Sequence, residues 1–162
     1  MQQPQIQIID YDEKYNHDIY ALHIAGLKSS NSLIEDVAMR NKYDKDLFDI
    51  QNAYLKNGGT FALAINEMGE LVGMGGIQAK GTYGVVKRMR VQPKQQGNGI
   101  GSMILDRLIS WAQGKFEYLD ADFILGSPAE KFYQHHGFKY VKEYPMHAGD
   151  ASWTERLYRF FL

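Results

Sequence analysis

The sequence has no cysteine, only four prolines and no long apolar run, and each absence excludes a class of protein. Without cysteine there is no disulfide framework, no thiol nucleophile and no Cys-ligated zinc. No stretch reaches the roughly 20 apolar residues of a membrane-spanning helix, so we expect no membrane partner. An excess of charge is also missing. The 18 Lys and Arg residues nearly balance the 19 Asp and Glu residues, which predicts no basic surface for nucleic acid.

The remaining composition is that of a folded protein, because 44% of the 162 residues are hydrophobic and 13% are aromatic. This length suits one domain of ordinary size, so we expect residues 1–162 to form a single domain. The first residues show no basic segment followed by an apolar one, the pattern typical of a secretion signal. We therefore expect a cytoplasmic protein.

The spacing of apolar residues predicts a mixed α/β domain with the element order βααβββαβαββ. The expected strands are a short one around Ile6 and Ile8, then 61–65, 71–74, 84–91, 118–125, 138–144 and 157–161. The expected helices are 15–26, 44–58, 100–114 and 128–137, the second of them capped by Asp44. Residues 29–43 are expected to form a loop or a poorly formed helix, and residues 145–154 either cover a pocket or simply connect two strands.

Three glycines, at positions 97, 99 and 101, lie between the predicted strand that ends near Val91 and the predicted helix that begins at Ile100. Glycines there allow a sharp turn and a close ligand approach, and the free amides of a helix start attract an anion such as a phosphate. Neither common nucleotide motif fits. The dinucleotide fingerprint would need a glycine at Ser102, and the chain has no Gly-Lys-Ser/Thr step. A tight turn that binds no ligand is the other interpretation.

Two patterns, about 30 residues apart, carry a resemblance to a known family. The first is Gln96-x-x-Gly99-x-Gly101 after the strand segment Arg88-Met89-Arg90-Val91-x-Pro93, and the second is Ala129-x-x-Phe132-Tyr133-x-x-x-Gly137-Phe138. In both, the sequence resembles the GNAT family of N-acetyltransferases, specifically from roughly residue 83 to 143. The resemblance implies an α/β fold with a mixed, mostly antiparallel sheet, helices on both faces and a splayed pair of central strands.

The resemblance also implies a site for acetyl-CoA as co-substrate. By similarity, backbone amides of the glycine turn hold the coenzyme pyrophosphate, and the strand before it pairs with the pantetheine arm. The implied residues are Gln96, Gly97, Asn98, Gly99, Ile100, Gly101 and Ser102 in the turn, and Met89, Arg90 and Val91 in the strand.

Tyr133 is, by the same similarity, the general acid that protonates the departing thiolate. Without the resemblance, its simplest interpretation is packing beside Phe132. The sequence departs from the family at two points. Val85 stands where many relatives carry a Glu that serves as general base, and Gly126, beside Ser127, stands where many carry an Asn. Because Val85 cannot take a proton, the base is another group, a water chain, or solvent acting on an amine of low pKa. The candidate side chains are Glu35, Asp36, His147 and Asp150.

The implied activity is direct transfer of an acetyl group to the amine of a small molecule or amino acid. No cysteine is present to carry an acetyl-enzyme intermediate. The alternatives are a non-catalytic acyl-CoA binding or sensing domain, motivated by Val85, and an unrelated nucleotide-binding domain. His135 and His136 point about 100° apart on a helix and have no third ligand at suitable spacing, so we expect no metal. A homodimer is left open.

Overall fold

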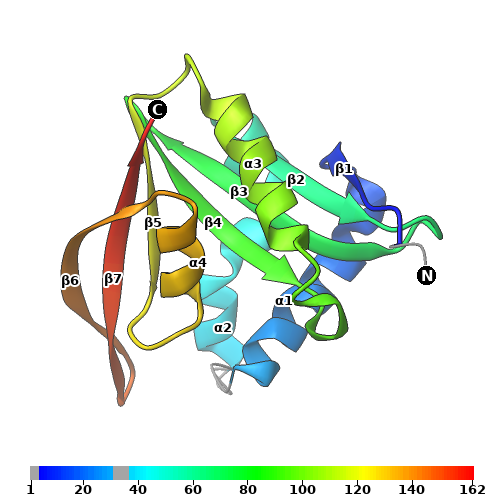
Figure 1. Ribbon diagram of the computed structural model, residues 1–162. Coiled ribbons are helices and arrows are strands. Elements are labelled where there is room, and N and C mark those ends of the chain that lie inside the picture. The colour runs from blue at the N-terminus through cyan, green and yellow to red at the C-terminus, as the bar shows by residue number, and fades with distance from the viewer. Residues whose placement is uncertain (1–3, 31–36) are drawn as a thin grey trace.

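The computed structural model describes residues 4–30 and 37–162, which are built around one seven-stranded sheet (Figure 1). In spatial order the strands are β1 (Gln7–Asp10), β2 (Thr60–Ile65), β3 (Leu71–Lys80), β4 (Tyr83–Val91), β5 (Tyr118–Ile124), β7 (Ala151–Phe161) and β6 (Lys139–Ala148). Neighbouring strands are antiparallel except for β4 and β5, which run parallel. This is the mixed, mostly antiparallel α/β sheet that the sequence predicted.

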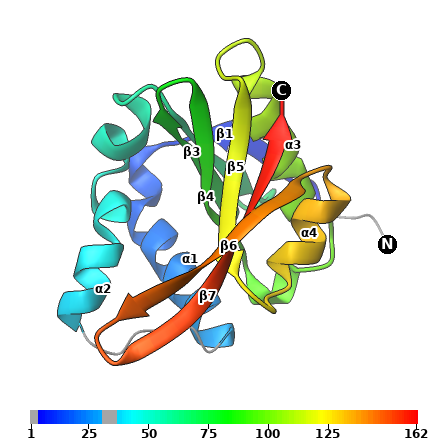
Figure 2. The same cartoon turned by 90° about the vertical axis from the view of Figure 1, so that its left-hand side faces the viewer.

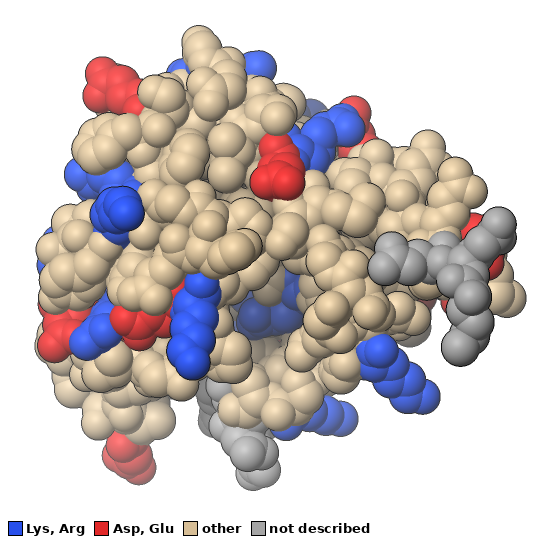
Figure 3. All heavy atoms as spheres, viewed as in Figure 1, with Lys and Arg blue, Asp and Glu red and all other residues tan. Residues whose placement is uncertain are grey.

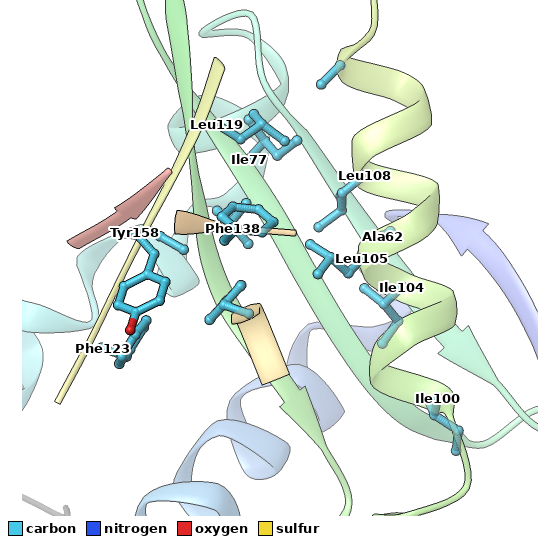
Figure 4. Packing of buried hydrophobic residues seen from close by; sticks show 14 of the residues in the cluster. Ala62, Ile77, Ile100, Ile104, Leu105, Leu108, Leu119, Phe123, Phe138 and Tyr158 are labelled. Atoms are coloured by element: carbon cyan, nitrogen blue, oxygen red, sulfur yellow. The ribbon is translucent and has the colours of Figure 1, made fainter. Parts of the chain in front are cut away.

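Helices cover both faces of the sheet, as expected from the resemblance (Figure 2). One face carries α3 (Ile100–Ala112) and α4 (Ala129–His135), and the other carries α1 (Asn16–Ser29) and α2 (Val37–Tyr43). Ile104, Leu105 and Leu108 point from α3 into the larger hydrophobic core (Figure 4). On the other face, Ile19 and Leu22 of α1 belong to a second core. None of the described helices is long and apolar enough to cross a bilayer.

The two central strands separate part-way along their length. β4 and β5 pair only through Gly84–Leu119, Val85–Asp120 and Val86–Ala121, and then diverge into a V in front of which α4 lies (Figure 1). A β-bulge follows, because Arg88 and Met89 both lie opposite the single residue Gly75 of β3. Arg88 has a positive φ of 60°, a conformation that costs energy in a residue with a Cβ. The splayed strand pair expected from the resemblance is therefore present, and a bulge marks it.

The prediction of one continuous helix over residues 44–58 is wrong. The chain forms a 3₁₀ turn at Lys45–Phe48 and a π turn at Gln51–Leu55 instead of one α-helix. The Asp44 side chain makes no capping hydrogen bond, because its carboxylate is buried and contacts His23 and Arg88. Pairing of a buried charge outweighs the local capping preference at this position.

The last two strands are longer than predicted, since β6 reaches Ala148 and β7 begins at Ala151. Residues 145–154, expected to form a pocket cover or a plain connection, therefore form the end of a hairpin in which His147 pairs with Ser152. β6 is an edge strand whose residues are mostly exposed, so it lacks the alternation of apolar and polar residues that predicts a strand.

Candidate active site

The glycine turn leaves the start of α3 open. Gly97 and Gly99 have φ of 84° and 77°, and a Cβ built on either would meet no atom within 4 Å. Gly99 is the N-cap of α3, and no side chain caps the helix there. Among the described residues, no amide from Gln96 to Ser102 donates a hydrogen bond to another part of the chain. The turn thus presents free amides at the positive end of a helix dipole, an arrangement suited to a phosphate.

The second sequence motif lies directly against this turn. A Cβ built on Gly101 would come within 3.3 Å of Cε2 of Phe132, so only a glycine lets α3 approach α4 this closely without a shift. The contact brings the glycine turn and the helix that carries Tyr133 to the same end of the splayed strands. The two motifs that carried the resemblance therefore form one site.

Tyr133 is 6% exposed and is held among aromatic rings. It stacks on Phe123 with ring centroids 5.6 Å apart and meets Phe138 edge-on at 5.1 Å. Its hydroxyl makes no hydrogen bond with any described residue. Burial raises the pKa of Tyr133, Arg90 acts to lower it and Asp122 acts to raise it further. The phenol therefore keeps its proton at neutral pH, with a cation and a carboxylate in electrostatic range.

A second unsatisfied hydroxyl lies in the turn between β5 and α4. The Ser127 Oγ is buried and has no hydrogen-bond partner among the described residues. A buried hydroxyl without a partner costs free energy, so it is suited to a polar ligand that enters the V. The sequence drew attention to this turn only because its Gly126 departs from the family.

The opposite face of the strand pair holds a pocket of about 280 Å³. Its lining residues are Tyr83, Val85, Asp120, Asp122, Lys142, Tyr144 and Leu157. Asp120 is neutralised by Arg159, whose Nε and Nη2 donate to its two oxygens at 2.7 and 3.0 Å. Asp122 is more exposed, and its Oδ2 accepts a hydrogen bond from the Tyr144 hydroxyl at 2.8 Å. Burial and Asp122 raise the pKa of Tyr144, so the phenol remains the donor of this bond.

A buried ionic cluster supports the bulge from the α1 side. Arg88 donates to both oxygens of Asp46, at 3.0 and 2.6 Å, and to the backbone oxygen of Tyr43 at 2.6 Å. These contacts hold the strained Arg88 backbone in place. Although burial acts to raise it, hydrogen bonds from Arg88 keep the pKa of Asp46 below its ordinary value. His23, 2.9 Å from Asp44, has its pKa lowered to about 4 by burial and by Arg88, so it is neutral near pH 7.

A family model for the acetyltransferase (GNAT) domain matches residues 57–140, more than half of the chain. This chain belongs to the GNAT family of acetyltransferases. The matched segment contains β2 to β5, α3 and α4, and thus the V, the glycine turn and Tyr133. As a GNAT protein it is an enzyme of the acyltransferase class. No curated protein sequence matches the chain.

Solved GNAT structures share the whole fold. A GNAT acetyltransferase from Staphylococcus aureus Mu50 superposes with a TM-score of 0.80 at 25% identity, covering 96% of this chain and 98% of its own. An acetyltransferase from Streptococcus agalactiae 2603 gives 0.78 at 22% identity and covers all of both chains. A GNAT acetyltransferase from Elizabethkingia anophelis, solved with acetyl-CoA bound, gives 0.66 at 21% identity, with 97% and 98% covered.

Of the base candidates named from the sequence, Glu35 and Asp36 lie outside the described residues. His147 and Asp150 are exposed at the turn end of the β6–β7 hairpin. Asp122, which the structure places in the pocket beside Val85, was not among the residues predicted from the sequence. A signal for it was present, because Leu119, Ala121 and Phe123 alternate with Asp120 and Asp122, which puts both carboxylates on one face of the strand.

The described part of this GNAT chain contains no group of three or more His, Asp or Glu residues that could hold a metal ion. His135 and His136 end α4, and the His136 Nδ1 lies 2.8 Å from the backbone oxygen of Phe132. The pair therefore contributes to the end of the helix.

Proposed function

We propose that this enzyme transfers an acetyl group from acetyl-CoA directly to the amine of a small molecule or amino acid. The observation that carries the proposal is Tyr133, a buried side chain at the opening between β4 and β5 whose hydroxyl has no hydrogen-bond partner among the described residues. The pocket of about 280 Å³ on the other face suits a small acceptor. We also expect the protein to act in the cytoplasm.

The residues around the V fit acetyl-CoA. The amides from Gln96 to Ser102 would hold the pyrophosphate, and the β4 backbone from Met89 to Val91 would pair with the pantetheine arm. That edge of β4 faces away from β3 and is not paired with β5. Its carbonyls at Met89 and Val91 accept hydrogen bonds from the side chains of Arg90 and Gln96, which can rearrange for a ligand. The buried Ser127 hydroxyl would provide a further contact.

When bound, acetyl-CoA supplies the acetyl group activated as a thioester. Tyr133 would donate its proton to the sulfur as the carbon–sulfur bond breaks, since its raised pKa keeps the proton available at neutral pH. Asp122 would accept the proton that the amine must lose, because it is the exposed carboxylate of the pocket and Val85 cannot take one. The bond from Tyr144 holds the Asp122 side chain in position.

Replacement of Tyr133 by phenylalanine tests the proposal, because it removes one hydroxyl and leaves the aromatic packing intact. We expect kcat to fall by roughly 10²-fold or more, the usual contribution of a general acid. Stability should change little, since the hydroxyl makes no hydrogen bond with a described residue. The measurement is release of free thiol from acetyl-CoA over a panel of small amines, with Tyr140→Phe as the matched control at an exposed tyrosine.

Equal turnover by wild type and Tyr133→Phe would contradict the assignment of the acid. Absence of turnover with every amine, together with stabilisation by acetyl-CoA, would favour the alternative of a non-catalytic acyl-CoA binding domain. Tighter binding of ATP or NAD than of acetyl-CoA would favour an unrelated nucleotide-binding domain.

A further inference from the structure

Arg90 has no counter-ion among the described residues. Arg88, Arg107, Arg156 and Arg159 each form an ion pair with a carboxylate, whereas Arg90, like Arg40 on α2, forms none with the described residues. With the described residues, the Arg90 side chain makes one hydrogen bond, from Nη1 to the backbone oxygen of Met89 at 3.2 Å. Its Nε is buried and has no hydrogen-bond partner among those residues. A partly buried guanidinium with unused donors costs free energy unless an anion pairs with it.

Helix α1 is shaped to accommodate this side chain. A Cβ built on Gly26 would lie 2.7 Å from Cδ and 3.1 Å from Nε of Arg90. Glycine inside a helix lowers helix stability relative to alanine, so a glycine at position 26 makes room for Arg90 and weakens the helix. The same contact places the Arg90 side chain on the face of β4 that α1 covers, which is the face of Val85 and the acceptor pocket.

Charges on the two sides of the V are of opposite sign. Arg90 projects from β4 and Asp122 from β5, and both are within electrostatic range of the Tyr133 hydroxyl. Figure 3 shows a hollow between α4 and the end of β4, with basic atoms at its floor. An acceptor whose amine lies near Asp122 would present any anionic group that it carries towards Arg90.

We propose that Arg90 binds the carboxylate of the acceptor, so that the substrate is an amino acid or another small amino carboxylate. The inference rests on the proposed function and deepens it. Guanidinium is the side chain best suited to this role, because its planar donors match the two oxygens of a carboxylate. Arg88 does not compete for the ligand, since both oxygens of Asp46 already engage it.

The test compares amino acids with the amines that lack the carboxylate. Phenylalanine with phenethylamine, histidine with histamine and lysine with cadaverine are assayed by thiol release from acetyl-CoA. For at least one pair we expect the wild type to favour the amino acid by roughly 10- to 100-fold in kcat/KM, the effect of a charged hydrogen bond. In Arg90→Gln this preference should disappear, mainly through KM, while Arg107→Gln, at an exposed position of α3, should keep it.

A second variant, Gly26→Ala, keeps the charge of the Arg90 guanidinium but should change its position. Gly26→Ala should displace the Arg90 side chain and reduce the preference without removing the guanidinium. Equal use of the amino acid and its decarboxylated amine by the wild type would overturn the inference. So would an Arg90→Gln protein that retains the preference but is no longer stabilised by acetyl-CoA, because Arg90 would then be a coenzyme ligand.

A binding experiment distinguishes failure of this inference from failure of the proposed function. If no amine is acetylated, the proposed function fails, and the melting temperature with amino acids in the presence of coenzyme A still tests Arg90. Stabilisation of the wild type but not of Arg90→Gln by the amino acids, and by neither of the matched amines, would support the carboxylate site. Equal responses of the two proteins would refute it.

Discussion

At the scale of single residues, His23 links the stability of the fold to pH. It is 1% exposed, its Nε2 faces Asp44, and its Nδ1 is buried without a hydrogen-bond partner among the described residues. Burial and the nearby Arg88 lower its pKa from 6.5 to about 4. Because protonation is easier in the unfolded chain, the unfolded state binds more protons between these two pH values. The free energy of unfolding must therefore decrease as the pH falls from about 6.5 to 4.

We expect a loss of roughly 3 kcal/mol across this range from His23, because each unit of pKa shift corresponds to about 1.4 kcal/mol. Urea unfolding at a series of pH values measures it. His23→Gln should flatten the pH dependence between 6.5 and 4, and His17→Gln, at an exposed position of the same helix, should leave it unchanged. An unchanged slope in His23→Gln would show that another group titrates.

At the scale of elements, alanine substitutions at two glycines distinguish the cost of backbone strain from the loss of ligand binding. Gly99 and Gly69 have φ of 77° and 79°, and a Cβ at either position would meet no atom within 4 Å. Alanine should therefore cost the same at both sites, about 1 kcal/mol, which corresponds to roughly 2–4 °C in melting temperature for a chain of this size. Only Gly99 belongs to the turn at the start of α3, so only Gly99→Ala should weaken acetyl-CoA binding, by about tenfold for the loss of one charged hydrogen bond.

Calorimetric titration of acetyl-CoA into both variants gives the two affinities, and thermal unfolding gives the two stabilities. Equal affinities would mean that the turn is only a tight connection, the other interpretation of its glycines. A large loss of affinity in Gly69→Ala, which lies in the β2–β3 turn, would show that the effect is global.

Elements with a regular apolar period were predicted well, and elements organised by polar contacts were not. Helix α3 follows directly from Ile100, Ile104 and Leu108, one turn apart on a single face. The short turns around Asp46 could not be read from the sequence, because their conformation depends on Arg88, which lies 42 residues later in the chain. Such a contact gives no local pattern.

The site shows the same division. Its glycine turn and Tyr133 were named from local motifs, and their roles stay predictions until tested. The position of Asp122, and the lack of a counter-ion for Arg90 among the described residues, depend on which strands are neighbours and where β4 and β5 separate. Those facts appear only when the sheet is assembled. Sequence spacing can therefore nominate the coenzyme side of this enzyme far better than its acceptor side.

At the scale of the whole molecule, the two hydrophobic cores share strands. Successive residues of β2 enter opposite cores, with Phe61 and Leu63 facing α1 and Ala62 and Ala64 facing α3. Unfolding either core must therefore disrupt the other. The β6–β7 hairpin is attached differently, because β7 pairs with β5 alone among the remaining strands. Cooperativity between the hairpin and the rest of the chain decides whether residues 1–162 form one domain.

We expect one transition, because Phe138 and Tyr158 join the hairpin region to the core under α3. Trp111 on α3 and Trp153 on β7 report the two regions separately, so Trp153→Phe and Trp111→Phe give two proteins with one fluorophore each. Their fluorescence midpoints in urea should agree with each other and with circular dichroism, as two-state unfolding requires.

An earlier midpoint for Trp153 would show that the hairpin opens on its own. The wall of the acceptor pocket that Lys142 and Tyr144 provide would then be a separately unfolding unit, and acceptor binding would have to stabilise it.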